Sequence, residues 1–295
     1  IRYLVRSRGL GDVYKRQQLG TDVIDELAQR GYGAVGVDVS ELDITDKDAV
    51  NRVLTDIRPD AVIHCAAWTA VDDAEDKPEA VRAVNALGTE YIAQVCGEIG
   101  CKLMYISTDY VFDGQGERAW MPDDDRQPLN VYGQTKYEGE LAVEKYTEKF
   151  FIVRIAWVFG FHGKNFIRTM LNLAKTHTEL NVVNDQIGSP TYTKDLARLL
   201  ADMIETERYG CYHATNEGFC SWYDFACEIF RQAAALGHEE CQQVIVHPVS
   251  SSEFPTKAKR PSNSRMSKEK LSENGFERLP DWKNALERYL KEIGY

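Results

Sequence analysis

Short apolar runs alternate with longer amphipathic segments along the first half of the chain. Continuous apolar runs at 34–37, 61–65, 103–106 and 151–155 predict strands that are buried on both faces. Between them, apolar residues recur every three or four positions at 22–29, 46–57, 78–99 and 132–146, which predicts helices, the second of them capped by Thr45. This alternation is typical of successive βαβ units, so we expect an α/β fold with a doubly wound parallel sheet.

The pattern changes after about residue 160. Helical periodicity returns at 165–176, 194–206, 221–236 and 282–293, but loops rich in Gly, Pro, Ser and Asn separate these segments. We therefore expect two parts, 1–160 and 161–295, of which the second is smaller and mostly helical and returns some segments to the first.

The composition is that of a folded protein with an acidic surface. The 295 residues are 43% hydrophobic and 27% charged, and 35 Lys and Arg against 46 Asp and Glu give a net charge of −11. This charge argues against nucleic acid or an anionic membrane as a partner. A few local cations could still bind an anionic small molecule, because distant charges are screened by salt.

Targeting signals and cysteine frameworks are not expected. No apolar run is long enough to span a bilayer, and charges interrupt the first twenty positions, where a signal peptide would be apolar. The 7 cysteines are odd in number and scattered without a Cys-x-x-Cys pair, so neither a disulfide framework nor a zinc ribbon is indicated. We expect a cytoplasmic protein and predict no bound metal.

Tyr132 and Lys136 are the first candidates for chemistry. A helical spacing of four places the phenol and the ammonium on one face. A nearby cation favours the phenolate, so Lys136 could bring the high pKa of a tyrosine toward the working range of an acid or base. Such a pair also arises by chance, and its weight depends on its surroundings.

Hydroxyl groups follow a predicted strand directly. Ser107 and Thr108 come after the apolar run 103–106, which places them at the carboxyl end of a parallel strand. Ligands of open α/β sheets bind at that edge, so Thr108 or Ser107 could bond a substrate oxygen while Tyr132 exchanges a proton with it. Turn or cap formation is the ordinary structural alternative for such residues.

The N-terminal turn carries only part of a dinucleotide-binding pattern. Gln18, Leu19 and Gly20 precede a helix, and Asp38 follows near the spacing of a carboxylate that holds the adenosine ribose. Charged residues occupy the preceding stretch, where an apolar strand and a glycine-rich turn would be needed: Arg2, Arg6, Arg8, Asp12, Lys15 and Arg16. Our hypothesis is that residues 1–17 are not native but a cloning or sequence-assembly scar.

Together these segments resemble the extended short-chain dehydrogenase/reductase family, and within it the reductases of dTDP-linked 4-keto sugars. The likeness runs from Gln18 almost to the C-terminus and is carried by the segments 18–20, 64–72, 84–85, 107–114, 128–136, 154–157, 184–191 and 260–265.

The resemblance implies a Rossmann-like dinucleotide-binding part at 1–160 and a mainly substrate-binding part at 161–295. The implied reaction passes hydride from NADPH or NADH to the C4 ketone of dTDP-4-dehydro-6-deoxy-L-mannose, yielding dTDP-L-rhamnose. Tyr132 would protonate the alkoxide, Lys136 would also hold the nicotinamide ribose, and Thr108 would act beside them. The implied partner is the dTDP-sugar alone, with the chain a monomer or homodimer.

The resemblance also implies two sets of binding residues. Those facing the cofactor are Gln18, Leu19, Gly20, Asp38, Asp43, Ile44, Ala66, Ala67, Tyr132 and Lys136. Those facing the sugar nucleotide are Thr108, Asp109, Trp157, Asn165, Arg260 and Arg265, of which the arginines suit a diphosphate because their donors fork bidentately.

Two other functions remain open from the sequence. One is a non-catalytic nucleotide-binding subunit, since the methionine adenosyltransferase regulatory subunit resembles the same family. The other is a related sugar-nucleotide epimerase or dehydratase, which would retain oxidised cofactor instead of consuming reduced cofactor.

Overall fold

A parallel sheet forms the centre of the molecule. The computed structural model describes residues 2–6 and 18–295. Within them, six parallel strands make the main sheet in the order β10-β5-β4-β3-β1-β2. Their bounds are β1 Arg2–Arg6, β2 Gly33–Val37, β3 Ala61–His64, β4 Lys102–Thr108, β5 Phe150–Ile155 and β10 Gly210–His213. The predicted α/β fold with a parallel sheet is confirmed.

The strand order places a switch point beside β1. The chain goes from β1 to its neighbour β2 and then returns to β3 on the other side of β1. In open sheets the crevice outside the carboxyl ends at such a point accommodates ligands. The backbone of Arg2–Arg6 pairs with both neighbours, so β1 lies between β3 and the edge strand β2. The altered glycine turn and most of the proposed scar lie outside the described residues.

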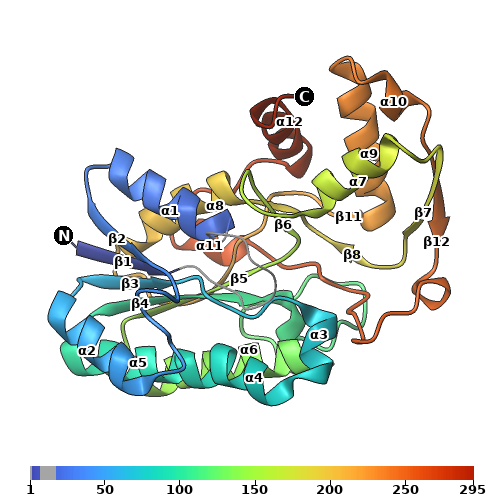
Figure 1. The fold of residues 1–295 in the computed structure, drawn as a ribbon. Coiled ribbons are helices and arrows are strands. Elements are labelled where there is room, and N and C mark those ends of the chain that lie inside the picture. The colour runs from blue at the N-terminus through green and yellow to red at the C-terminus, as the bar shows by residue number, and fades with distance from the viewer. Residues whose placement is uncertain (1, 7–17) are drawn as a thin grey trace.

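Helices cover both faces of the sheet, as Figure 1 shows. On one face, α1 (Gln18–Gln29) packs against α8 (Thr193–Ile204). On the other, α2 (Lys47–Ile57), α5 (Gly88–Ile99) and α6 (Val131–Tyr146) share a second apolar core with the sheet. Both α8 and β10 come from beyond residue 160, so the C-terminal half of the chain completes the sheet and its cover.

Two local predictions differ from the structure. Asp46, rather than Thr45, caps α2, because its carboxylate accepts hydrogen bonds from the backbone N–H groups of Asp48 and Ala49. The single helix predicted at 78–99 is α4 (Pro78–Arg82), the π-helical turn η1 (Ala83–Leu87) and α5 in succession. The π turn carries Asn85, whose Oδ1 accepts from the Trp68 N–H at 2.7 Å and ties this helix to the loop after β3.

A second lobe lies beyond the carboxyl ends of the strands (Figure 1). Its core joins α7 (Phe166–Ala174), α9 (Trp222–Ala235) and α12 (Trp282–Glu292). Three small strand pairs accompany these helices: β6 (Val158–Phe159) with β9 (Thr191–Tyr192), β8 (Ile187–Gly188) with β11 (Cys220–Ser221), and β7 (Glu179–Val183) with β12 (Ile245–Val249). The sequence did not predict these pairs. The strands of the first two pairs have two residues each and no readable alternation, and polar residues (Asn181, His247) interrupt the apolar runs of the five-residue strands β7 and β12.

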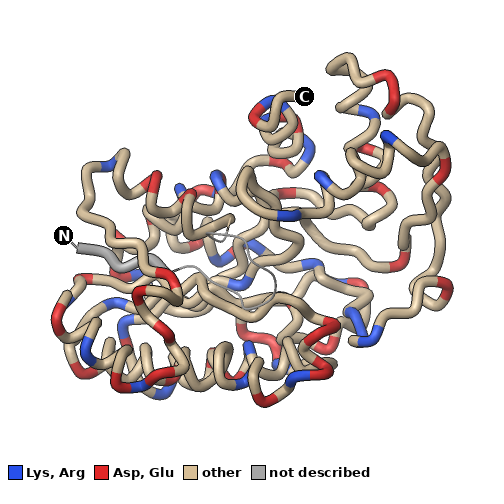
Figure 2. The backbone as a smooth tube through the Cα atoms, in the orientation of Figure 1, with Lys and Arg blue, Asp and Glu red and all other residues tan. Residues whose placement is uncertain are grey.

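Shorter elements complete the described chain. They are α3 (Val71–Asp76), η2 (Asp109–Val111), α10 (Glu239–Gln242), η3 (Ser251–Glu253) and α11 (Glu269–Glu273). Figure 2 shows acidic and basic residues interspersed over both lobes. Across residues 2–6 and 18–295, no helix combines the length and the apolar character that a membrane span requires.

Candidate active site

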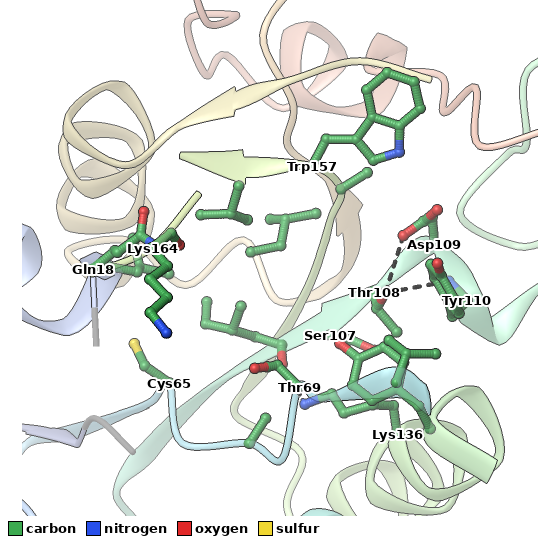
Figure 3. A pocket seen from close by; sticks show the side chains of 18 of the residues that line it. Gln18, Cys65, Thr69, Ser107, Thr108, Asp109, Tyr110, Lys136, Trp157 and Lys164 are labelled. Carbon is green, nitrogen blue, oxygen red and sulfur yellow. Dashed lines mark hydrogen bonds between the residues drawn. The ribbon is translucent and has the colours of Figure 1, made fainter. Parts of the chain in front are cut away.

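A cavity of about 400 Å³ opens where the strands end and the second lobe begins. Its walls come from the N-terminus of α1, the ends of β3, β4 and β5, one face of α6 and the start of α9 (Figure 3). Of the residues expected to act in catalysis or binding, eight line it: Gln18, Leu19, Ala67, Thr108, Asp109, Tyr132, Lys136 and Trp157. The cavity therefore combines residues from both predicted sets.

Thr108 and Asp109 form a hydrogen-bonded pair at the end of β4. The Thr108 hydroxyl donates to Asp109 Oδ1 at 3.0 Å and accepts from the Tyr110 N–H at 3.3 Å, which caps η2 (Figure 3). Burial raises the pKa of Asp109 to about 6, although hydrogen bonds from Ser264 and Thr108 oppose the shift. This carboxyl group therefore titrates close to neutral pH.

Lys136 is buried beneath the cavity floor. Its side chain is 1% exposed, and Nζ donates to the Ile106 carbonyl oxygen at 2.7 Å while lying 4.0 Å from the centre of the Tyr105 ring. Burial lowers the pKa of Lys136 to about 7, against the attraction of Glu140. The ammonium is thus easily deprotonated in the ligand-free protein.

Tyr132 does not show the activation expected from Lys136. Burial raises the pKa of Tyr132, a hydrogen bond with Thr108 partly opposes the shift, and Lys136 is not among its causes. The expectation that Lys136 brings this pKa toward neutrality is therefore wrong for the ligand-free protein, because the ammonium is directed to the Ile106 carbonyl. The phenol stays protonated at neutral pH, which suits a proton donor.

A buried ion-pair network supports the helix that carries this pair. Glu140, one turn after Lys136, binds Arg154 of β5 through two 2.8 Å hydrogen bonds, and both side chains are almost fully buried. Arg126 reaches the same carboxylate at 3.0 Å, and the hydroxyl of the cavity residue Ser107 donates to it at 2.5 Å. Although burial raises the pKa of Glu140, these partners lower it overall.

Trp157 lies in a backbone conformation that non-glycine residues rarely adopt. Its φ is 49°, in the left-handed region, which costs about 1 kcal/mol. Thr191 holds this backbone: its N–H donates to the Trp157 carbonyl at 3.1 Å and its hydroxyl to the Ala156 carbonyl at 2.6 Å. The strain directs the indole toward the cavity, where Figure 3 shows it at the end opposite Gln18.

The cofactor candidates divide between the cavity wall and the surrounding fold. Gln18 donates from Nε2 to the Lys164 carbonyl at 2.9 Å, and this contact holds the loop after β6 against α1. Asp38 follows β2 at the sheet edge, where its carboxylate accepts from the Val39 N–H at 2.7 Å, and Asp43 bonds Thr45. Outside the cavity lining are Gly20, Asp38, Asp43, Ile44 and Ala66, of which Ile44 and Ala66 belong to the apolar core.

Three substrate candidates lie outside the cavity lining. Asn165 caps α7 by accepting from the Arg168 N–H, and its amide donates to Gly160 and Tyr289, so its side chain is committed to structure. Arg260 pairs with Asp72 at 2.7 Å, and Arg265 donates to the Asn263 side chain. These three residues do not line this cavity, and their contact with a substrate stays a prediction.

The sequence did not single out several cavity residues. These are Cys65, Thr69, Val71, Ile106, Tyr110, Ile155, Ala156, Val158, Lys164 and Trp222. Tyr110 adjoins Asp109, and Thr69 lies two residues after Ala67, so position after a strand was the available signal. Trp222 had none, because only tertiary packing brings the start of α9 to the end of β5.

The hydrogen-bonding chemistry of the cavity fits a nicotinamide dinucleotide. Gln18 Oε1 is an acceptor that is buried without a hydrogen-bond partner within the described chain, so it suits a hydroxyl or amide donor of the cofactor. The N-terminus of α1, where Gln18 lies, favours an anion such as a pyrophosphate. The buried Lys136 ammonium has hydrogen-bond capacity beyond its contact with Ile106. Among residues 2–6 and 18–295, no cluster of three or more His, Cys, Asp or Glu side chains is suited to a metal ion.

Comparison with known proteins decides the family. Residues 14–294 match the family described as RmlD substrate binding domain. The chain belongs to this family. It is 38% identical to the dTDP-4-dehydrorhamnose reductase of Escherichia coli K12 over 288 residues, which is 95% of this chain and 96% of that protein.

Solved structures of family members agree in fold. A dTDP-4-dehydrorhamnose reductase from Clostridium acetobutylicum superposes with a TM-score of 0.92 at 39% identity and covers 100% of both chains. The enzyme of the same name from Bacillus anthracis, solved in complex with NADP, gives a TM-score of 0.91 at 40% identity over 99% of each chain.

Proposed function

We propose that this chain is an NADPH-dependent reductase that converts dTDP-4-dehydro-6-deoxy-L-mannose into dTDP-L-rhamnose by reducing the C4 ketone. The observation that carries the proposal is the placement of Thr108, Tyr132 and Lys136 around one cavity, at the carboxyl ends of the strands, in a member of this family. The E. coli relative named for this activity is similar along almost the whole chain.

Tyr132 acts as the general acid. Hydride from the reduced nicotinamide of the bound cofactor would leave negative charge on the C4 oxygen. Tyr132 donates its proton to that oxygen, and its high pKa ensures that the proton is present when needed. Thr108 hydrogen-bonds both Tyr132 and Asp109, so it holds these two side chains close together at the cavity.

Lys136 and Asp109 bind and orient. Lys136 would hold the nicotinamide ribose through the N–H donors that its contact with the Ile106 carbonyl leaves available. Asp109 accepts from a hydroxyl group of the sugar, because its carboxylate lies in the cavity wall beside Thr108. Trp157 covers the sugar from the loop after β5.

NADPH is the cofactor we favour, with NADH as the alternative. The B. anthracis relative was solved with NADP. Asp38, at the carboxyl end of β2, lies where a carboxylate would favour the free ribose hydroxyls of NADH. Comparing turnover with NADPH and NADH distinguishes the two.

Further properties follow from this reaction. We infer that 1–160 binds the cofactor, that 161–295 mainly binds the sugar nucleotide, and that the dTDP-sugar is the partner, with no nucleic acid or membrane involved. The chain acts as a monomer or homodimer in deoxysugar and cell-surface polysaccharide synthesis. Its seven cysteines are free thiols, which supports a cytoplasmic location.

A turnover assay tests the proposal. The 4-keto sugar nucleotide is generated in place, and oxidation of NADPH is followed by its near-ultraviolet absorbance. We expect oxidation that depends on the sugar nucleotide and yields dTDP-L-rhamnose. No turnover together with tight binding to another protein would favour a regulatory subunit. Oxidised cofactor that copurifies and is not consumed would favour an epimerase or dehydratase.

A further inference from the structure

Two indoles from different lobes stack at the cavity. The rings of Trp157 and Trp222 are 3.7 Å apart with an interplanar angle of 17°, and both residues line the cavity. Trp157 follows β5, whereas Trp222 is the first residue of α9. Stacked aromatic pairs stabilise each other's orientation beyond the area that they bury. The stack therefore joins the second lobe to the catalytic edge of the sheet.

The position of Trp222 is fixed by the start of α9. Ser221 Oγ accepts from the Asp224 N–H and Asp224 Oδ2 from the Ser221 N–H, both at 2.9 Å, which is a complete capping box. Phe166 packs against the indole at 4.7 Å. The capping box and the contact with Phe166 therefore hold Trp222 in place even if the Trp157 ring shifts.

Gly188 gives the Trp157 ring its space. A Cβ atom at Gly188 would lie 2.9 Å from Trp157 Cε2 and 3.0 Å from Cζ2, closer than side chains normally approach. Gly188 pairs with Cys220 across β8 and β11, and β11 leads directly into α9. The pairing of β8 with β11 thus positions both Gly188 and Trp222, the two residues next to the Trp157 ring.

We propose that Trp222 and Gly188 are positioning residues that hold the Trp157 indole as a wall for the hexose of the sugar nucleotide. The inference rests on the proposed function. The Trp157 ring lines the same cavity as Thr108, Asp109 and Tyr132, and in the proposed function these three residues surround the reacting carbon of the sugar. The hexose, and not the nucleotide, therefore lies against the indole. The C–H groups on a sugar ring face complement a flat apolar surface.

Differential binding tests the proposal. Calorimetry measures the affinity of the full chain, with NADP⁺ present, for dTDP-L-rhamnose and for dTDP. We expect Trp222→Ala and Gly188→Ala to weaken dTDP-L-rhamnose about tenfold, in line with the loss of an aromatic contact, and to leave dTDP within about twofold. Trp222→Phe, which keeps a stacking ring, should restore most of the affinity.

Trp282→Phe is the matched control. Trp282 belongs to the same lobe and packs against Phe225, but it does not line the cavity. This variant should keep both affinities. Near-ultraviolet circular dichroism provides an independent readout, because the signal of the stacked indoles should be lost in Trp222→Phe and in Trp157→Phe but not in Trp282→Phe.

The outcomes separate this inference from the proposed function. If Trp222→Ala and Gly188→Ala weaken both ligands by the same factor, or neither ligand, while the wild type prefers dTDP-L-rhamnose, the inference alone is overturned. If the wild type binds neither ligand and shows no turnover, the proposed function falls and the inference with it. Should Trp222→Ala not fold, Gly188→Ala decides the question.

Discussion

Lys136 shows how strongly burial alters a single side chain. An ammonium that is 1% exposed has lost its water, so its charged form is destabilised and its pKa falls to about 7. Burial also destabilises the charged form of Asp109, and because that form is the deprotonated one, the pKa of Asp109 rises to about 6. Two groups of one cavity therefore titrate within the range in which the enzyme would operate.

These values predict a narrow pH profile for kcat/KM. Asp109 loses its negative charge as the pH falls through about 6, and Lys136 loses its positive charge as the pH rises through about 7. We expect kcat/KM for the sugar nucleotide to decline on both sides, since this parameter reports the free enzyme. Asp109→Asn should abolish the acid limb, and an unchanged acid limb would assign it to another group.

The stability of the ligand-free chain should respond to Lys136 as well. The folded-state pKa lies below the value of a free lysine, so the unfolded chain binds more protons between about pH 7 and 10. Stability contributed by this group therefore rises with pH across that window. Urea unfolding should show a smaller rise for Lys136→Met than for the wild type. Equal slopes would mean that Lys136 is charged in the folded protein.

Removal of the proton donor should affect chemistry alone. Tyr132→Phe is expected to lower kcat by about 10²–10⁴, the usual contribution of a positioned general acid, with little change in NADPH binding. Tyr137→Phe on the same helix is the control, because Tyr137 does not line the cavity. Steady-state kinetics with both substrates make the comparison, and full turnover by Tyr132→Phe would exclude the assigned role.

At the scale of the element, α6 combines the proposed acid and its neighbouring lysine with a buried ion pair at one helical spacing. Tyr132, Lys136 and Glu140 follow each other at intervals of four, which places them along one face of the helix. The first two line the cavity, and the third binds the buried Arg154 of the neighbouring strand. The ion pair therefore fixes the position of α6 relative to β5.

Breaking this ion pair should destabilise the fold. Arg154→Met leaves the buried Glu140 carboxylate with the more distant Arg126 as its remaining cation, so we expect the free energy of unfolding to fall by about 3 kcal/mol. Arg231→Met removes a pair with Glu228 in which the arginine is exposed, and it should cost less than about 1 kcal/mol. Urea unfolding measures both, and equal losses would show that burial of the pair is unimportant.

At the scale of the whole molecule, a polar junction joins the two lobes. Asn216 accepts from the Tyr192 N–H at 2.8 Å and donates to Asp195 and to the Pro280 carbonyl, both at 2.9 Å. Asp195 lies on α8, which packs on the sheet, and Arg288 of α12 binds the same carboxylate through two hydrogen bonds. The junction links the sheet cover to the second lobe behind the cavity.

Loss of this junction should weaken the molecule as a unit. Asn216 is fully buried, so Asn216→Ala leaves unpaired polar groups and should lower the free energy of unfolding by about 1–3 kcal/mol. The exposed Asn172→Ala on α7 is the control and should have little effect. Thermal or urea unfolding checks the prediction, and a neutral Asn216→Ala would indicate that the lobes are joined by apolar packing alone.

Much of the fold and part of the site could be predicted because they depend on local patterns. Apolar runs predicted β3, β4 and β5 within one or two residues, since strands buried on both faces require continuous apolar sequence. The run at 34–37 located β2 equally well, but its expected burial on both faces was wrong, because β2 is an edge strand with Val35 and Gly36 exposed. The spacing of Tyr132 and Lys136 and the hydroxyl groups after β4 placed these residues in one cavity, because a helix face and a strand end are local properties.

What only the tertiary structure decided depends on contacts between distant segments. The direction of the Lys136 ammonium toward Ile106, the commitment of Asn165 to capping and of Arg260 to Asp72, and the stack of Trp222 on Trp157 all arise from packing of separate elements. Such contacts leave no periodic trace along the chain, because their energies depend on which surfaces meet. Thus the sequence by itself determined the family, the sheet and the spacing of Tyr132 and Lys136, whereas the tertiary structure determined which side chains line the cavity and how burial adjusts their charge.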